Sequence, residues 1–204
     1  MVLLAALAAA LAPAWAATPL VLVVGDSLSA EYGLKRGTGW VALMEQRMGQ
    51  EKVAARVVNA SISGDTTSGG RSRLPALLKQ HRPTHVVIEL GGNDALRGLP
   101  LEMTEANLSA MAGAAREAGA KVLLVGVQVP PNYGRAYAER FENLYDKVAR
   151  QARTAVVPSI LKGVADGPDA TSLFQPDRIH PTEQAQPLLM ANVWPALKKL
   201  LTTK

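Results

Sequence analysis

Cysteine is absent from the 204-residue sequence. Its absence excludes cysteine nucleophiles, disulfides, cysteine-ligated zinc and iron–sulfur clusters, so a nucleophile would have to be a serine, a threonine, a lysine or a carboxylate. Histidine is also scarce, since the only three are His81, His85 and His180, and none belongs to the H-E-x-x-H pattern of a helical zinc site. We therefore expect neither a metal site nor a cofactor.

A dense cluster of basic residues is missing too, although Lys and Arg outnumber Asp and Glu by 22 to 17. The basic residues occur in scattered pairs such as Lys35-Arg36 and Lys198-Lys199, whereas a nucleic-acid-binding face needs closer grouping. A mildly cationic surface is the simpler interpretation. We expect no nucleic-acid partner, and the sequence indicates no obligate protein partner.

The N-terminal segment carries no charge. Its first sixteen residues, MVLLAALAAALAPAWA, are apolar and end in Ala14-Trp15-Ala16, a small–x–small sequence that signal peptidase accepts. The run is shorter than the ~20 apolar residues of a membrane span, so we expect no stable membrane insertion. We predict a signal peptide over residues 1–16, cleaved after Ala16, and a periplasmic or secreted protein. The alternative is a short helix retained in a cytoplasmic protein, because the usual basic residue before the apolar run is missing.

The remaining chain has no Gly/Ser-rich linker and no internal repeat. Its composition, with 48% hydrophobic and 19% charged residues, favours one packed core. After Pro19, short apolar runs alternate repeatedly with longer amphipathic segments. We predict that residues 17–204 form one α/β domain, a three-layer α/β/α sandwich with a mostly parallel five-stranded sheet.

The predicted strands are short runs rich in Val, Leu and Ile, as is typical of buried parallel strands. They are Leu20–Val24, Val53–Asn59, His85–Leu90, Lys121–Val127 and Ala155–Val157. The predicted helices are Trp40–Met48, Gly70–His81, Thr104–Ala118, Arg135–Arg153 and Glu183–Leu201. Right-handed crossovers would place these helices on both faces of the sheet, and ligands of such sheets bind beyond the carboxyl ends of the strands. We therefore expect the functional residues just after the strands.

Polar segments follow the first three strands, and a fourth precedes the last helix. They are Gly25–Ser29, Ser61–Thr66, Gly91–Asp94 and Pro176–Pro181. Ser27 lies on a tight turn, where Gly25 lets the backbone bend between strand and helix. A serine hydroxyl needs an imidazole to take its proton, and the imidazole needs an orienting carboxylate. We predict Ser27 as the nucleophile, with His180 as its base and Asp177, spaced D-x-x-H, as the orienting acid.

The same segments contain candidates for an oxyanion hole. Attack on a carbonyl creates an oxyanion, which preorganised N–H donors stabilise. Asn93 offers a side-chain amide, Gly64 an unobstructed backbone N–H, and Ser27 its own backbone N–H. Taken singly, these segments could be ordinary turns or a helix cap. Their coincidence at positions that an α/β topology brings together favours an acyl-transfer site.

These residues and their surroundings resemble the SGNH, or GDSL, hydrolase superfamily. The resemblance runs from about Leu20 to Leu201, and GDSLSA, VVNASISGDTT, RLPALLKQHRP, ELGGNDALRG and PPNYG look like the bacterial periplasmic thioesterase I/lysophospholipase and arylesterase branch. It implies a flavodoxin-like fold without a cofactor. It also implies the nucleophile at Ser27, oxyanion donors at Gly64 and Asn93, and the acid and base at Asp177 and His180. Glu31 and Ala95 stand where that branch often has glycine, and we expect both to line the acyl cleft.

The predicted function is that of a serine esterase that cleaves ester and thioester bonds of small acyl substrates, namely aryl esters, acyl-CoA and lysophospholipids. We expect connections of about 5–15 residues after the strands, too short for a lid, and hence an open cleft tolerant of the leaving group. The acyl wall is expected on the loops Ala95–Pro100 and Pro130–Gly134. Its substrate-binding residues would be Leu96, Leu99 and Tyr133, unless these loops only cap the core.

Other classes of protein remain as alternatives. The segment Gly37–Ala42 fits the G-x-G-x-x-A of a dinucleotide-binding loop, but it begins about a dozen residues beyond the strand instead of directly on it. An α/β-hydrolase elbow fails, because Ser29 occupies the second glycine position of G-x-S-x-G. A catalytically weak SGNH scaffold that binds a lipid or glycan would be expected to lack Ser27 or His180, and both are present.

Overall fold

The computed structural model describes residues 18–167 and 170–203, so the predicted signal peptide lies outside the described residues. One sheet of five strands has the order β2-β1-β3-β4-β5, and every pairing is parallel. The strands are β1 (Leu20–Gly25), β2 (Arg56–Asn59), β3 (His85–Glu89), β4 (Lys121–Val125) and β5 (Ala155–Val157). This is the flavodoxin-like order, in which the chain switches direction beside β1 and leaves a crevice at the carboxyl ends of β1 and β3.

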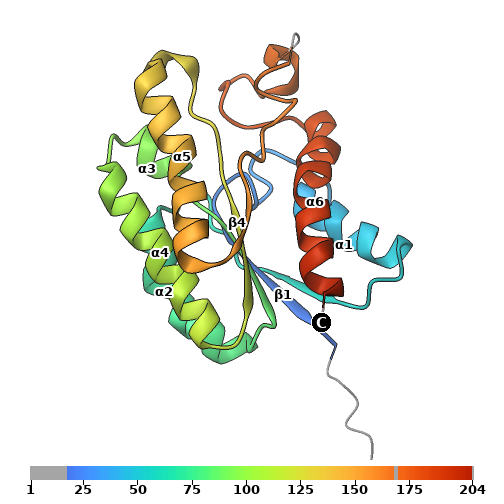
Figure 1. The fold of residues 1–204 in the computed structure, drawn as a ribbon. Coiled ribbons are helices and arrows are strands. Elements are labelled where there is room, and N and C mark those ends of the chain that lie inside the picture. Colours follow the sequence, from blue (N-terminus) through green and yellow to red (C-terminus); the bar gives the residue numbers. More distant parts are fainter. Residues whose placement is uncertain (1–17, 168–169, 204) are drawn as a thin grey trace, which may run out of the picture.

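Helices cover both faces of the sheet (Figure 1). Helices α1 (Trp40–Gln50) and α6 (Gln186–Thr202) pack together on one face, and α2 (Thr67–His81), α4 (Leu101–Glu117) and α5 (Arg135–Ala152) cover the other. The prediction of a three-layer α/β/α sandwich is confirmed. No helix within residues 18–167 and 170–203 combines the length and the apolar character needed to span a bilayer.

The central strands β1 and β3 are buried on both sides, so their sequences are nearly continuous apolar runs. All six residues of β1 and all five of β3 are buried. In their register Val21 pairs with His85 and Gly25 pairs with Glu89, so the two strands end at the same level. The segments that follow them therefore emerge side by side at one edge of the sheet.

Several local elements differ from the prediction, and α2 and α4 each begin three residues earlier than expected, at Thr67 and Leu101. A five-residue helix, α3 (Gly92–Leu96), follows β3 where we expected a loop, because so short a helix shows no apolar periodicity. The predicted strand Val53–Asn59 begins only at Arg56. The last predicted helix, Glu183–Leu201, begins as a separate 3₁₀ turn, η3 (Glu183–Ala185), before α6.

The prediction of uniformly short connections, about 5–15 residues each, is wrong for the segment between β5 and α6. Residues 158–185 form this connection, which includes η2 (Ala170–Leu173), η3 and an antiparallel bridge between Phe174 and Pro181. Its position depends on distant contacts: Nδ2 of Asn192 on α6 donates hydrogen bonds to the carbonyl oxygens of Ile160 and Lys162, at 2.9 and 2.8 Å. Such contacts leave no periodic signal in the sequence.

Candidate active site

Ser27 lies in the turn that follows β1. Gly25 ends this strand, and a Cβ there would lie 2.6 Å from Oγ and 2.7 Å from Cβ of Ser29, so the close approach requires glycine. Oδ1 of Asp26 accepts a hydrogen bond from the backbone N–H of Leu28 at 3.0 Å, which closes the turn in the manner of an Asx-turn. A local hydrogen bond thus shapes the turn that presents the serine at the carboxyl edge of the sheet.

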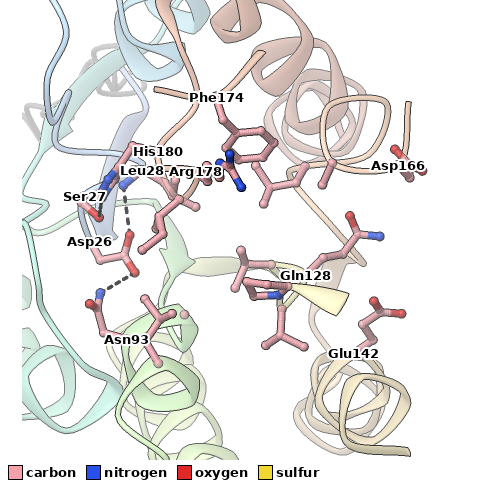
Figure 2. A pocket seen from close by; sticks show the side chains of 18 of the residues that line it. Asp26, Ser27, Leu28, Asn93, Gln128, Glu142, Asp166, Phe174, Arg178 and His180 are labelled. Atoms are coloured by element: carbon pink, nitrogen blue, oxygen red, sulfur yellow. Dashed lines mark hydrogen bonds between the residues drawn. The ribbon is translucent and has the colours of Figure 1, made fainter. Parts of the chain in front are cut away.

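Ser27, His180 and Asp177 form a hydrogen-bonded chain. Nε2 of His180 lies 2.9 Å from Oγ of Ser27 (Figure 2), and Nδ1 of His180 lies 2.6 Å from Oδ2 of Asp177. With its proton on Nδ1, the imidazole presents Nε2 as an acceptor to the serine hydroxyl. The structure therefore brings together the three side chains that the sequence predicted, in the order that proton transfer from serine requires.

The backbone also holds Asp177. Its Oδ1 accepts hydrogen bonds from the N–H groups of Ile179 and His180, each at 3.0 Å. Partial burial acts to raise the pKa of Asp177, but these two N–H groups and the imidazole outweigh it and lower the pKa to about 2. The carboxylate is therefore ionised at neutral pH and can stabilise an imidazolium.

Two residues that the sequence analysis missed join the loop of His180 to the nucleophile side. Nε2 of Gln175 donates to the carbonyl oxygens of Tyr32 and Pro181, at 2.9 and 3.2 Å. The ring of Tyr32 packs against the imidazole of His180, with 4.3 Å between the ring centroids. Tyr32 and Gln175 are 143 residues apart in the sequence, so no local pattern could have linked them.

Asn93 lies in the first turn of α3 and lines the same pocket as Ser27. Its Nδ2 donates a hydrogen bond of 3.0 Å to Oδ2 of Asp26, as Figure 2 shows. The preceding Gly91 has a φ of 126°, and a Cβ there would lie 2.3 Å from the hydroxyl oxygen of Tyr145. Glycine at this position therefore lets α3 begin in close contact with Tyr145 of α5.

Gly64, the other predicted oxyanion donor, lies in the loop after β2. It has a φ of 78°, a conformation that favours glycine. Its carbonyl oxygen accepts a 2.8 Å hydrogen bond from Nη2 of Arg97. This bond ties the loop of Gly64 to the residue that follows α3, so both predicted oxyanion segments lie beside the same helix.

A largely apolar pocket of about 640 Å³ extends from Ser27 and His180 (Figure 2). This volume is within the ~300–1,000 Å³ usual for small-molecule sites. Gln128, Glu142 and Asp166 lie at the end away from the serine. The apolar lining comes from segments that follow β1, β3, β4 and β5: Leu28, Leu96, Val127, Val129, Leu161 and Phe174.

The residues expected to form an acyl wall lie only partly in the lining of this pocket. Leu96 does line the pocket, with 42% of its surface exposed, but Leu99 and Tyr133 do not belong to the lining. Leu99 follows α3 in a turn closed by its N–H and the carbonyl oxygen of Asp94 at 2.9 Å, and Tyr133 packs on Tyr137 with 5.6 Å between ring centroids. Of the two loops in which the wall was expected, Leu96 and Pro130 line the pocket, and the β5–α6 connection contributes further lining residues, Leu161 and Phe174.

Glu31 and Ala95 also lie outside the pocket lining, contrary to expectation. Ala95 is buried in the core, with 2% of its surface exposed. Oε1 of Glu31 accepts hydrogen bonds from the N–H groups of Gly37 and Gly39, at 3.0 and 2.9 Å. A dinucleotide phosphate would need those N–H groups. Because the Glu31 carboxylate already occupies them, the segment is not arranged as a dinucleotide-binding loop.

Metal-binding side chains are not gathered near the serine. In the part of the chain that the structure describes, no group of three or more His, Cys, Asp or Glu is placed to hold a metal ion. The polar residues that line the pocket near Ser27 are Ser27 itself, Asp26, Asn93, Arg178 and His180. Their chemistry is nucleophilic attack, hydrogen bonding and proton transfer.

The family comparison agrees with this geometry. The model of the GDSL-like Lipase/Acylhydrolase family matches residues 23–187, a span that includes the nucleophile turn, α3 and the loop of His180. The chain belongs to this family. The predicted class, a carboxylic ester hydrolase of the SGNH type, is therefore confirmed.

Relatives with assigned names cover most of the chain. Esterase TesA of Pseudomonas aeruginosa is 54% identical over 186 residues, 91% of each protein. The arylesterase of Vibrio mimicus is 40% identical over 185 residues, again 91% of each. Thioesterase 1/protease 1/lysophospholipase L1 of Escherichia coli is 43% identical over 174 residues, 85% of this chain and 81% of the relative.

Solved structures confirm the SGNH hydrolase fold. The crystal structure of TesA superposes with a TM-score of 0.85 at 54% identity, covering 89% of this chain and 99% of that one. The psychrotrophic esterase EstA from Pseudoalteromonas sp., in a structure inhibited by monoethylphosphonate, gives a TM-score of 0.83 at 37% identity, with 90% and 99% coverage.

Proposed function

We propose that this enzyme hydrolyses ester and thioester bonds of acyl substrates through an acyl-enzyme on Ser27. The observation that carries this proposal is the chain of hydrogen bonds from Asp177 through His180 to Ser27, at 2.6 and 2.9 Å, at one end of an apolar pocket. These hydrogen bonds activate the serine hydroxyl as a nucleophile, and the pocket provides space for an acyl group beside it.

The reaction has two halves. In the first, Oγ of Ser27 attacks the acyl carbonyl carbon while Nε2 of His180 takes the hydroxyl proton. The backbone N–H groups of Ser27 and Gly64 and the amide of Asn93 stabilise the oxyanion. The tetrahedral adduct then expels the alcohol or thiol, which receives the proton from His180. In the second half, water attacks the acyl-serine with His180 as base, releasing the carboxylic acid and restoring Ser27.

Aryl esters, acyl-CoA thioesters and lysophospholipids are the substrates that we propose. They share an acyl carbonyl and differ in the leaving group. The names of the relatives include esterase, arylesterase, thioesterase and lysophospholipase, beside protease. The acyl chain would occupy the apolar pocket, and the leaving group would lie at the open rim. An enzyme that contacts mainly the acyl part discriminates weakly between leaving groups.

Labelling with a fluorophosphonate tests the proposal, because the reagent phosphonylates an activated serine. We expect one adduct on Ser27 by peptide mass spectrometry, together with hydrolysis of p-nitrophenyl esters. Ser27→Ala should lose both, whereas the control Ser68→Ala, exposed on α2, should keep both. An adduct on another serine, or turnover by Ser27→Ala, would contradict the assignment. Labelling without turnover of any ester or thioester would favour the weak scaffold that binds a lipid or glycan.

We also propose that the enzyme is exported, with residues 1–16 removed as a signal peptide and residues 17–204 forming one domain. The support is the apolar, uncharged run that ends in Ala14-Trp15-Ala16. Expression in a Gram-negative host, followed by fractionation and intact-mass measurement, should give a periplasmic protein that begins at Ala17. A cytoplasmic protein that retains residues 1–16 would refute this proposal.

A further inference from the structure

Two carboxyl groups lie buried behind the nucleophile turn. Asp26 is 2% exposed, and Glu89, the last residue of β3, is fully buried. Glu89 accepts hydrogen bonds from Oγ of Ser29, at 2.7 Å, and from the backbone N–H of Asp26. Neither carboxyl forms an ion pair with any residue that the structure describes. Two acids without a paired cation therefore share one buried site below Ser27.

Burial decides which of the two acids carries the charge. Burial raises the pKa of Asp26 to about 6, against the lowering effect of the N–H of Leu28 and the amide of Asn93. Burial and the neighbouring charge of Asp26 raise the pKa of Glu89 well above its usual range. Asp26, whose pKa is about 6, is therefore ionised at neutral pH, and Glu89 keeps its proton to higher pH than Asp26 does. The other titratable or charged groups near this pair are Asp65, Arg73, Asp94, Tyr145 and His180.

The amide of Asn93 can adopt two orientations that exchange its oxygen and nitrogen. Only one orientation presents an N–H to an oxyanion formed on Ser27. Nδ2 carries two hydrogens, and Oδ2 of Asp26 accepts one of them at 3.0 Å (Figure 2). A carboxylate can only accept, so it excludes the orientation in which the amide oxygen of Asn93 would face it.

We propose that Asp26 is a positioning residue: its carboxylate selects the orientation of Asn93 in which the second amide N–H is available to the oxyanion. The inference rests on the proposed function, because it assumes that the oxyanion forms on Ser27. Oδ1 of Asp26 has a separate structural task, since it accepts the N–H of Leu28. The two oxygens can therefore be tested separately.

Asp26→Asn is the sharpest substitution, because it preserves the size of the side chain and can keep an acceptor for Leu28. It replaces the oxygen that faces Asn93 by an NH₂ group, so two donors would oppose each other. We expect Asn93 to rotate and present its amide oxygen to the new amide and to the cleft. Loss of a single oxyanion donor costs about 10²–10³ in kcat, and we expect Asp26→Asn to lower kcat by a similar factor with little change in KM.

A double-mutant cycle with Asn93→Ala separates positioning from general damage. If Asp26 acts through Asn93, the double variant should have the kcat of Asn93→Ala within about threefold, because the second change removes nothing further. Losses that multiply would overturn the proposal, as would an Asp26→Asn enzyme with wild-type kcat. Asp94→Asn is the matched control: it neutralises another fully buried acid, which binds Thr67 instead. We expect its effect to multiply with that of Asn93→Ala.

An NMR measurement on the wild-type protein keeps the proposal testable if Asp26→Asn does not fold. The side-chain NH₂ of Asn93, assigned by its disappearance in Asn93→Ala, should shift with pH around the pKa of Asp26, about 6. A resonance that does not change between pH 4.5 and 8 would overturn the proposal. Failure of the proposed function gives a different result, because Ser27→Ala would then keep its activity. If Ser27→Ala is inactive but the kcat losses of Asp26→Asn and Asn93→Ala multiply, only the role of Asp26 is refuted.

Discussion

Two segments reach Ser27 in different ways. The β1–α1 turn follows directly on β1 and is closed by a local contact, that of Asp26 with Leu28 two residues away, and Asn93 also binds it from a distance. The β5–α6 connection is long, and contacts with distant residues hold it, such as that of Gln175 with Tyr32. The first segment presents the proposed nucleophile, Ser27, and the second presents the proposed base, His180, and part of the pocket lining. Turn chemistry therefore sets the local shape of the segment that carries Ser27, whereas the position of the segment that carries His180 depends on the docking of a long connection.

The largest effect should come from removing the base on the docked segment. His180→Ala should lower kcat by about 10⁶, and the double variant with Ser27→Ala should cost little more, because the triad acts as a unit. Steady-state rates on a p-nitrophenyl ester measure both. His81→Ala, on α2, should keep the wild-type rate. Losses that multiply between Ser27 and His180 would show that the two segments act independently.

The next effect concerns the acid of the same segment. Asp177→Asn should leave the loop in place but favour the wrong imidazole tautomer, and the equivalent change in a chymotrypsin-type triad lowers kcat by about 10⁴. We expect a similar loss with an unchanged melting temperature. Asp146→Asn, on α5 and outside the pocket lining, serves as the control for loss of a carboxylate. A silent Asp177→Asn would mean that another group orients His180.

A smaller effect is expected from the apolar pocket lining, part of which comes from the β5–α6 connection. Leu161→Ala, Phe174→Ala and Leu96→Ala should each lower kcat/KM for long acyl chains by about tenfold relative to short ones, because burial of each methylene group of the acyl chain contributes ~0.8 kcal/mol. Leu99→Ala, which changes a residue outside the pocket lining, should give a profile parallel to that of the wild type. Plots of kcat/KM against acyl length decide the matter. If only Leu99→Ala changed the dependence of kcat/KM on acyl length, the segment after α3 would contact the acyl chain instead.

The smallest effect, a few degrees in melting temperature, concerns the buried acid behind the turn. The folded-state pKa of Glu89 lies well above the unfolded value of about 4.3. As pH rises past the unfolded value, only the unfolded chain loses this proton, so the wild type loses stability until the folded pKa is reached. Glu89→Gln removes this loss. Its melting temperature relative to the wild type should therefore be higher at pH 8 than at pH 5. The exposed control Glu45→Gln should show no such difference. If the difference in melting temperature between Glu89→Gln and the wild type did not change with pH, Glu89 would be ionised in the folded protein.

Much of the catalytic centre could be predicted because its signals are local. The strands are continuous apolar runs, and the polar residues that follow them reach one edge of a parallel sheet. Asp177 and His180 are three residues apart, so one turn of chain joins acid and base. Gly64 and Asn93 could be named as oxyanion donors from the N–H groups that their segments offer, and the family resemblance implies the same roles.

Tertiary structure decided the features that depend on contacts between distant residues. The sequence determined a parallel α/β sheet with serine, acid and base near its carboxyl edge, because strand and turn preferences operate over a few residues. Only the fold placed Phe174 in the pocket and Leu99 outside it. It also joined Asp26 to Asn93 across 67 residues. Such contacts form when helices and connections dock on the sheet. Packing between distant segments determines which residues meet, and it leaves no pattern along the chain.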